Sequence, residues 1–349
     1  ANSWTRRPFC GTVLLVPFVA VGVRSCVCSV PQDAPRSYRG ELVGQARQRE
    51  LDLLRWLQAG ADSPAPPLMA GSAVASALAS APRAAAEVLR RWEGLDWFAT
   101  SPYVQFIEAY GLNLTLINHD NSPDPDSVKV YDLLFHPVPP GGVALDVGSH
   151  VGMVAVFLAK LNPGSRIVAF EPAESNRFLV ELNLAINGVP FLPSDLSAED
   201  APLPKAEDVG FVEVRGEAVA GSDGSRDFAF VAGDSDISGF EWGPWRHPLN
   251  SLIKKLHSSQ YTRVSTITLK SAIELAGAEK IHFLKLDCEG CEFEAVPQLD
   301  EATLDRLLYV CGEYHNWLFA DAVSANQTLH VICSRHWDLR ADTEGMMLC

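Results

Sequence analysis

The residues best suited to chemistry begin at Asp146, which is followed by Gly148 and Gly152. The apolar run Val143–Val147 predicts a short buried strand before them, and Met153–Leu161 predicts a helix after them. Glycine lets the backbone turn sharply and lets a ligand approach the main chain. The N–H groups at a helix N-terminus can bind a polar or anionic group. The segment therefore predicts a ligand-binding turn between a strand and a helix.

A second carboxylate, Glu171, ends the next predicted strand, Arg166–Phe170. A carboxylate at this place in an α/β unit commonly binds ribose hydroxyls, which indicates a cofactor that contains a nucleoside. A dinucleotide-binding turn would need G-x-G-x-x-G. Here His150 and Met153 stand where the second and third glycines would be. The pattern therefore disfavours an oxidoreductase that uses NAD.

Four blocks follow one another along the chain. They are Asp146-Val147-Gly148-Ser149-His150-Val151-Gly152, Phe170-Glu171-Pro172, Leu284-Lys285-Leu286-Asp287-Cys288-Glu289-Gly290-Cys291-Glu292 and Glu313-Tyr314-His315. The series resembles the FkbM family of S-adenosyl-L-methionine (SAM)-dependent methyltransferases, whose members show D-V-G-A-N-x-G, F-E-P, L-K-I-D-V-E-G-x-E and an E-x-H-type strand end. The third block is the most specific part. The resemblance implies a class I methyltransferase fold, SAM as cofactor, and O-methylation of a small molecule or glycan.

Carried onto this chain, the resemblance implies a cofactor site made of Asp146, Gly148, His150, Gly152, Glu171, Glu217 and Ala218. The aspartate and the two glycines of the first block would surround the methionine part of SAM. Glu171 would bind the ribose, and Glu217 with Ala218, at the end of the third strand, would border the adenine. His150 is a departure, because the family usually has Asn there, but its side chain can still donate a hydrogen bond.

Catalysis of methyl transfer depends largely on positioning, and a hydroxyl nucleophile also benefits from a general base. Asp287, Glu289 and His315 are expected at carboxyl ends of central strands, where open α/β sheets bind ligands. His315 is the first choice for the base, since the ordinary pKa of imidazole, about 6.5, suits neutral pH. Asp287 is the second choice, as a base or an orienting group. Alternatively, His315 and Glu313 form a hydrogen-bonded pair that fixes a loop.

Several of these residues also have a purely structural interpretation. Asp146 could cap the turn that follows it, and Glu171 could cap the helix that starts at Ala173. Lys285, inside an apolar strand, is expected to pair with a buried carboxylate.

The pair Cys288 and Cys291 is interpreted as two cysteines that replace small apolar residues, because it lies inside the third block rather than at the start of a thioredoxin-like fold. The carboxylates of Asp287, Glu289 and Glu292 could bind a divalent ion, as in some O-methyltransferases. No spacing of His and Cys matches a zinc site, so no metal is predicted.

The 349 residues carry a net charge of −15, which argues against a nucleic-acid substrate, because such binding depends on Lys and Arg. From Val143 onward, predicted strands and helices alternate, which is typical of a parallel α/β sheet. With the resemblance, the expected fold is a Rossmann-like, mostly parallel seven-stranded sheet with helices on both faces and an N-terminal helical extension. The other expected elements are helices at Glu41–Gln58, Arg83–Arg91 and Glu174–Asn187, strands at Leu112–Leu116, Phe211–Val219, Ile281–Asp287 and Leu307–Glu313, an antiparallel edge at Thr328–Cys333 and Trp337–Leu339, a linker at Ala61–Pro82, and a loop at Val189–Gly210.

Three regions are predicted along the chain. Residues 1–30 contain the apolar run Phe9–Val23 and no acidic residue, which favours a signal peptide or signal anchor and a secretory or membrane-anchored location. An organellar transit peptide and a cytoplasmic protein are the alternatives. Residues 31–100 are expected to form a helical stem or linker, and residues 101–349 the methyltransferase domain. The competing functional hypothesis is a non-catalytic module of the same fold, tethered to a membrane by the N-terminal segment.

Overall fold

The computed structural model describes residues 52–57, 59, 72–95, 102–119, 131–196, 208–230, 239–240, 260–313, 340–341 and 346–348. The predicted targeting segment, the predicted strand Thr328–Cys333 and the candidate base His315 lie outside these residues. No helix in the described part of the chain is long and apolar enough to cross a membrane.

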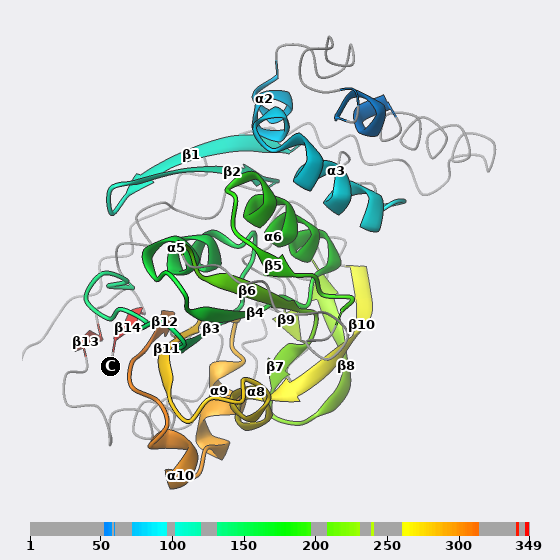
Figure 1. The fold of residues 1–349 in the computed structure, drawn as a ribbon. Helices are drawn as coiled ribbons and strands as arrows, with labels where there is room; N and C mark the ends of the chain where they lie inside the picture. The colour runs from blue at the N-terminus through cyan, green and yellow to red at the C-terminus, as the bar shows by residue number, and fades with distance from the viewer. Residues whose placement is uncertain are drawn as a thin grey trace, which may run out of the picture. The chain divides into compact units, whose positions relative to one another are not determined.

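A mostly parallel sheet forms the centre of the domain (Figure 1). Its parallel strands are β3 (Val143–Val147), β4 (Arg166–Phe170), β5 (Phe191–Leu192), β6 (Phe211–Arg215), β11 (Ile281–Leu286) and β12 (Val310–Glu313), and two short antiparallel strands, β13 (Arg340–Ala341) and β14 (Met346–Leu348), extend one edge. The order is β13-β14-β12-β11-β3-β4-β6-β5. The predicted Rossmann-like fold is confirmed, and the described part of the sheet has eight strands where seven were expected.

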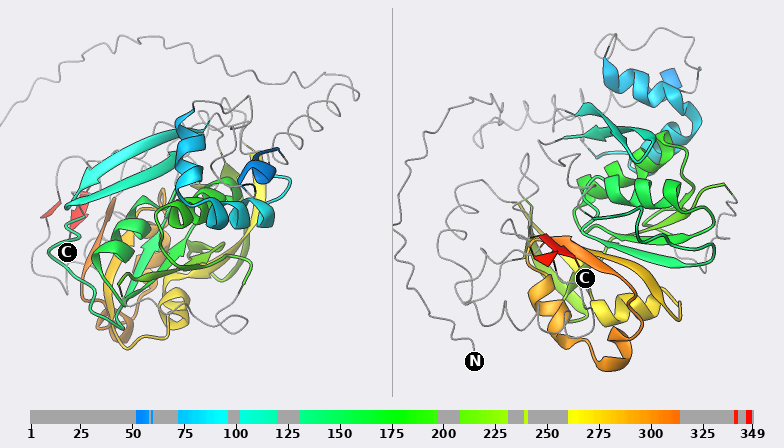
Figure 2. Two further views of the ribbon diagram at one scale, coloured as in Figure 1. Left: turned by 45° about the horizontal axis from the view of Figure 1, so that its top comes forward. Right: turned by 90° about the vertical axis from the view of Figure 1, so that its left-hand side faces the viewer.

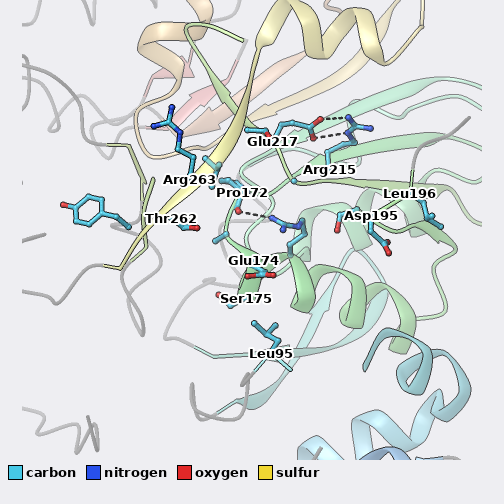
Figure 3. A pocket seen from close by; sticks show the side chains of 17 residues that line it. Leu95, Pro172, Glu174, Ser175, Asp195, Leu196, Arg215, Glu217, Thr262 and Arg263 are labelled. Carbon is cyan, nitrogen blue, oxygen red and sulfur yellow. Dashed lines mark hydrogen bonds and ion pairs between the residues drawn. The ribbon is translucent and has the colours of Figure 1, made fainter. Parts of the chain in front are cut away.

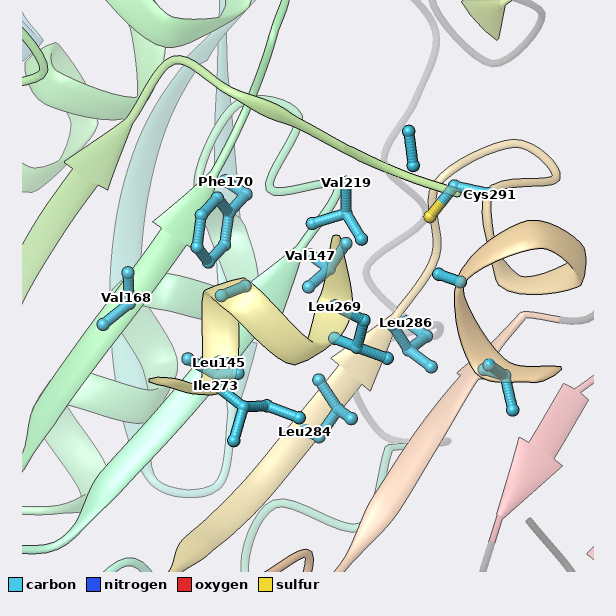
Figure 4. Packing of buried hydrophobic residues seen from close by; sticks show 14 of the residues in the cluster. Leu145, Val147, Val168, Phe170, Val219, Leu269, Ile273, Leu284, Leu286 and Cys291 are labelled. Atoms are coloured by element: carbon cyan, nitrogen blue, oxygen red, sulfur yellow. The ribbon is translucent and has the colours of Figure 1, made fainter. Parts of the chain in front are cut away.

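Helices cover both faces of this sheet because its strands alternate their side chains between two cores. Ala144 packs with α5 (Met153–Leu161) and α6 (Glu174–Ile186) on one face. Its neighbour Leu145 points to the other face, in a cluster with α8 (Leu269–Leu275) (Figure 4). The short helices α9 (Glu292–Ala295), η3 (Val296–Gln298) and α10 (Glu301–Leu304) contribute to this second cluster or adjoin it.

A second sheet changes the prediction for the third strand. The expected strand Phe211–Val219 divides, because β6 ends at Arg215 and β7 (Ala218–Ala220) pairs with β10 (Gln260–Thr268) instead. The strands β8 (Gly224–Phe230) and β9 (Gly239–Phe240) complete this sheet in the order β7-β10-β8-β9. Gly216 and Glu217 therefore form the connection between the two sheets, where the chain leaves the parallel core.

Upstream of the parallel sheet lie two helices, α2 (Ala73–Ser80) and α3 (Pro82–Arg91), and a hairpin of β1 (Tyr103–Ala109) and β2 (Leu112–Asn118). The linker prediction for Ala61–Pro82 was wrong at α2, because alanine favours a helix and the Ser72 hydroxyl accepts the Ala75 N–H as an N-cap. Both helices share a hydrophobic cluster with α6, and α3 contacts α6 directly (Figure 2).

A buried carboxylate fixes this contact. Glu181 of α6 is fully buried; one of its oxygens accepts hydrogen bonds from Arg91 and from Trp92 Nε1, the latter at 2.7 Å. The other oxygen accepts from the backbone N–H and the hydroxyl of Ser194, both at 3.0 Å. A buried charge needs such partners, so the end of α3 is specifically held against α6.

Candidate functional site

Three of the predicted site residues lie together because parallel strands end at one edge of the sheet. Asp146 is the penultimate residue of β3, Glu171 directly follows β4, and Asp287 directly follows β11. Strand β3 pairs with both β4 and β11. The backbone N–H of Asp287 also donates to the carbonyl oxygen of Val147 at 3.1 Å. The first three sequence blocks therefore form one site at the carboxyl edge, as their order predicted.

A single buried cation, Lys285, connects the ends of β3 and β11. Its Nζ lies 2.7 Å from the carbonyl oxygen of Gly148, 3.3 Å from Asp287 Oδ2 and 3.5 Å from Asp146 Oδ1. Burial alone would lower the pKa of Lys285, but the charges of Asp287 and Asp146 raise it above its ordinary value. Lys285 therefore stays charged, and its expected pairing with a buried carboxylate is confirmed.

Asp146 keeps its hydrogen-bonding capacity unused. It is completely buried, yet among the described residues neither of its carboxylate oxygens has a hydrogen-bond partner. It does not cap the turn, since the Ser149 hydroxyl donates to its backbone carbonyl oxygen at 3.0 Å instead. Burial raises the pKa of Asp146, and the Lys285 ammonium opposes that rise. Buried polar groups are normally paired, so this carboxylate is well suited to a ligand that brings its own donor or positive charge.

The two glycines of the turn are required by its backbone. Gly148 and Gly152 have φ of +78° and +84°, and His150 between them has φ of +53°. A Cβ added to Gly148 would lie 1.7 Å from the carbonyl oxygen of Asp287, so no larger residue fits there. At Gly152 the nearest atoms, in Val180, would be 3.1 Å away. Gly148 therefore brings two strand ends into direct backbone contact.

Three N–H groups of the turn itself are engaged by other parts of the protein. Those of Gly148 and Ser149 both donate to the carbonyl oxygen of Phe170 at 3.0 Å. That of His150 donates to Glu171 Oε2 at 2.7 Å. The turn is thus tied to the end of β4 by three hydrogen bonds, and its own side chains and the neighbouring carboxylates are left to recognise a ligand.

Glu171 joins the turn to the next helix. Its Oε1 accepts the N–H of Ala173, the residue before α6, at 2.9 Å. This contact is structural, but it is not the predicted helix cap, because α6 begins at Glu174 and has no side-chain cap hydrogen bond. Burial raises the pKa of Glu171, which is opposed mainly by His150 and by the two backbone N–H groups. Each carboxylate oxygen can accept a second hydrogen bond, so the structural role leaves room for ribose hydroxyls. The ribose role stays a prediction.

A cavity of about 890 Å³ begins directly after Glu171 (Figure 3). It is lined by Leu95, Pro172, Ala173, Glu174, Ser175, Arg177, Ser194, Asp195, Leu196, Arg215, Gly216, Glu217 and Tyr261–Ser265. Glu217 is held there by Arg215, at 2.5 Å, whereas Ala218 is buried at the start of β7. The volume is within the usual range for small-molecule sites. Three residues of the predicted loop Val189–Gly210 take part in it.

Sequence reasoning missed the guanidinium that braces this cavity. Arg177 Nη1 donates to the carbonyl oxygens of Glu171 and Pro172, at 3.1 and 2.9 Å. It thereby fixes the backbone that carries the candidate ribose ligand. The signal in the sequence was faint: an arginine one turn into the helix that follows Glu171-Pro172.

Comparison with known proteins identifies the family. The methyltransferase FkbM domain matches residues 146–332. The chain belongs to this family. Two curated relatives each match 51% of the chain: "AMB antimetabolite synthetase AmbE" of Pseudomonas aeruginosa, 25% identical over 188 residues, and "Methyltransferase 1" of Beauveria bassiana, 24% identical over 183 residues. The aligned part is 9% of the first relative and 66% of the second. No solved structure matches the chain.

The third block of this chain contains two cysteines, of which Cys288 stands where the FkbM pattern has valine and Cys291 stands at an unrestricted position. Cys288 and Cys291 form a disulfide, so they are not merely small apolar replacements as predicted. Among the described residues, the side chains grouped closely enough to hold a metal are Cys288, Cys291 and Glu292. Because the two sulfurs are bonded to each other, this group offers no thiolate in the state described. The alternative metal set of Asp287 and Glu289 with Glu292 is not brought together.

Asp287 is also held by Tyr131, a residue that lies outside the FkbM blocks and that the sequence pattern did not indicate. Tyr131 is 3% exposed, and its hydroxyl donates to Asp287 Oδ2 at 3.0 Å, on the oxygen that also faces Lys285. Burial and the charge of Asp287 raise the pKa of Tyr131 well above its ordinary value, so the hydroxyl remains a donor. Asp287 is thus held in one orientation, and Glu289 beside it has φ of +56°.

Replacing Tyr131 with phenylalanine should lower the free energy of unfolding by about 1.5–3 kcal/mol, because it removes one buried hydrogen bond to a charged group. Urea denaturation followed by tryptophan fluorescence measures this change. Tyr103→Phe, on the exposed side of the hairpin, is the matched control and should have little effect. Equal stability of the two variants would contradict the proposed restraint on Asp287.

Proposed function

We propose that this FkbM protein is a SAM-dependent methyltransferase that transfers a methyl group to a hydroxyl oxygen of a small molecule or glycan. The observation that carries the proposal is the carboxylate of Asp146, fully buried and without a hydrogen-bond partner among the described residues, at the strand end between Glu171 and Asp287. Buried and negative, it suits a cationic ligand that is also able to donate hydrogen bonds.

The residues of the edge fit the parts of SAM in turn. The carboxylate of Asp146, which faces Lys285 at 3.5 Å but has no hydrogen-bond partner among the described residues, would receive the ammonium of the methionine part, beside the turn shaped by Gly148 and Gly152. Glu171 would accept the ribose hydroxyls on the lone pairs that the backbone leaves, and Glu217 would border the adenine. SAM, when bound, supplies a methyl group activated by a positively charged sulfur. The protein's own contribution is to position this group and to exclude water.

The roles at the acceptor divide between three residues. Asp287 is held by Tyr131 and Lys285, which supports an orienting role for it more than that of a freely moving base. His315 remains the proposed base, and Glu289 a candidate for acceptor contact. The cavity that begins after Glu171 is lined by Glu217 and therefore belongs with the adenine end of SAM, so the proposed hydroxyl acceptor rests on the candidate base and on the family resemblance.

Isothermal titration of the full chain with SAM tests the cofactor assignment. We expect saturable binding of one SAM per chain and no binding of NADH, because the turn lacks the glycines that a pyrophosphate needs. Absence of SAM binding by a folded preparation would contradict the proposal. That result would favour the non-catalytic module, a reading to which the three engaged N–H groups of the turn lend some support.

A further inference from the structure

The disulfide of Cys288 and Cys291 lies in the loop directly after Asp287. Cys288 is half-buried, whereas Cys291 is 1% exposed and belongs to the hydrophobic cluster around β11. Cys288 is therefore the more exposed member of the pair, although it also packs against this cluster, and Cys291 is shielded. We propose that this pair is a thiol–disulfide exchange site whose oxidation state changes the affinity of the neighbouring turn for SAM. The second half of this statement rests on the proposed function.

The loop is coupled to the turn through backbone contact. The carbonyl oxygen of Asp287 occupies the space that a Cβ on Gly148 would need, at 1.7 Å, so the two backbone segments are in direct contact. The disulfide encloses Glu289 and Gly290, whose φ angles are +56° and +102°. The first is an unfavourable conformation for a residue with a side chain. The covalent bond holds the enclosed residues in this conformation, and its loss allows them to relax.

The reduced state also has a place in the fold. Glu292 Oε2 accepts the N–H of Gly290 at 3.1 Å and lies 3.2 Å from Cys288 Sγ. After reduction, the Cys288 thiol finds a hydrogen-bond acceptor already in position, while the contact to Gly290 keeps the loop anchored. Both oxidation states are therefore compatible with the same surrounding structure, which a reversible site requires.

The exchange needs a dithiol reductant, either a small molecule or the dithiol of a reducing protein. One thiolate of the reductant attacks Sγ of Cys288, the bond between the cysteines breaks, and Cys291 leaves as a thiolate that takes up a proton. The second thiolate of the reductant then attacks its own sulfur in the mixed disulfide and releases Cys288. Two electrons and two protons pass to the protein in total, and the reductant becomes a disulfide.

Peptide mass spectrometry of the full chain tests the exchange. Trypsin releases Leu286–Arg306, a peptide that contains Cys288 and Cys291 and none of the other six cysteines. We expect no iodoacetamide adduct on this peptide from native protein, two adducts after native treatment with dithiothreitol and EDTA, and none again after reoxidation with oxidised glutathione. EDTA prevents the released thiols from binding a metal. Two adducts without reductant, or none after it, would overturn the exchange site.

Titration with SAM tests the coupling. Reduction should weaken SAM binding about tenfold, within the usual range for coupling between two sites. Cys288→Ala/Cys291→Ala should bind SAM like the reduced protein and stop responding to dithiothreitol, whereas Cys311→Ala, at a buried free cysteine, should keep the response. An affinity independent of oxidation state would overturn the coupling. Absence of SAM binding in both states would instead refute the proposed function, and the peptide result would still decide whether the exchange site exists.

Discussion

Replacing Glu171 with glutamine should weaken SAM binding about 100-fold, which corresponds to about 3 kcal/mol. Hydrogen bonds to a charged group contribute about 1.5–3 kcal/mol each, and the ribose offers two hydroxyls to this carboxylate. The amide removes the charge. Because both carboxylate oxygens already accept a backbone N–H, at His150 and Ala173, the amide nitrogen must also face one of these donors. Isothermal titration with SAM measures the affinity directly.

The structural role of Glu171 makes a separate control necessary. Urea denaturation gives the fraction of folded variant, so that the affinity refers to folded protein only. Glu279→Gln, which changes an exposed carboxylate, should leave the SAM affinity unchanged. If the Glu171 variant loses stability but binds SAM as tightly as the natural protein, Glu171 only holds the backbone of the turn and of Ala173, and the ribose assignment fails.

The parallel core could be predicted from the sequence because its signals are local. The strands Val143–Val147 and Arg166–Phe170 and the helix Met153–Leu161 have the bounds expected from their apolar runs and flanking glycines. The sequence order of the blocks also placed Asp146, Glu171 and Asp287 at one edge, since parallel strands point their carboxyl ends the same way.

The contacts between distant segments could not be predicted in this way. Tyr131 reaches Asp287 across 156 residues, and no periodicity links the two positions. The predicted strand from Phe211 to Val219 contains Gly216 in its middle, but only the pairing with β10 reveals that the chain changes sheets there. Such choices are set by tertiary packing, which local propensity does not encode.

Lys285 is the positive charge that Asp146 and Asp287 share at the carboxyl edge of the sheet, and its removal should give the largest loss of stability. Lys285→Met should lower the free energy of unfolding by about 3–5 kcal/mol, because it leaves Asp146 and Asp287 without their shared positive partner. Methionine matches the length of the lysine stem, so little packing is lost. Urea denaturation at pH 7.5 measures the change. Lys270→Met, which breaks an exposed pair with Asp300, is the matched control and should cost much less.

The dependence of this loss on pH separates a charge effect from a packing effect. Burial already raises the pKa of Asp146 in the folded protein, and removal of Lys285 raises it further. An acid whose pKa is higher in the folded state than in the unfolded state loses stability as pH rises from the unfolded value, about 3.9, through the folded one. The loss in free energy of unfolding caused by Lys285→Met should therefore shrink as pH is lowered from 7.5 towards 4.5.

In the double variant of Lys285→Met with Asp146→Asn, part of the lost stability should return at pH 7.5, because the amide carries no buried charge. A penalty that is the same at both pH values and is not relieved in the double variant would mean that Lys285 acts through packing alone, and the electrostatic account of this edge would fail.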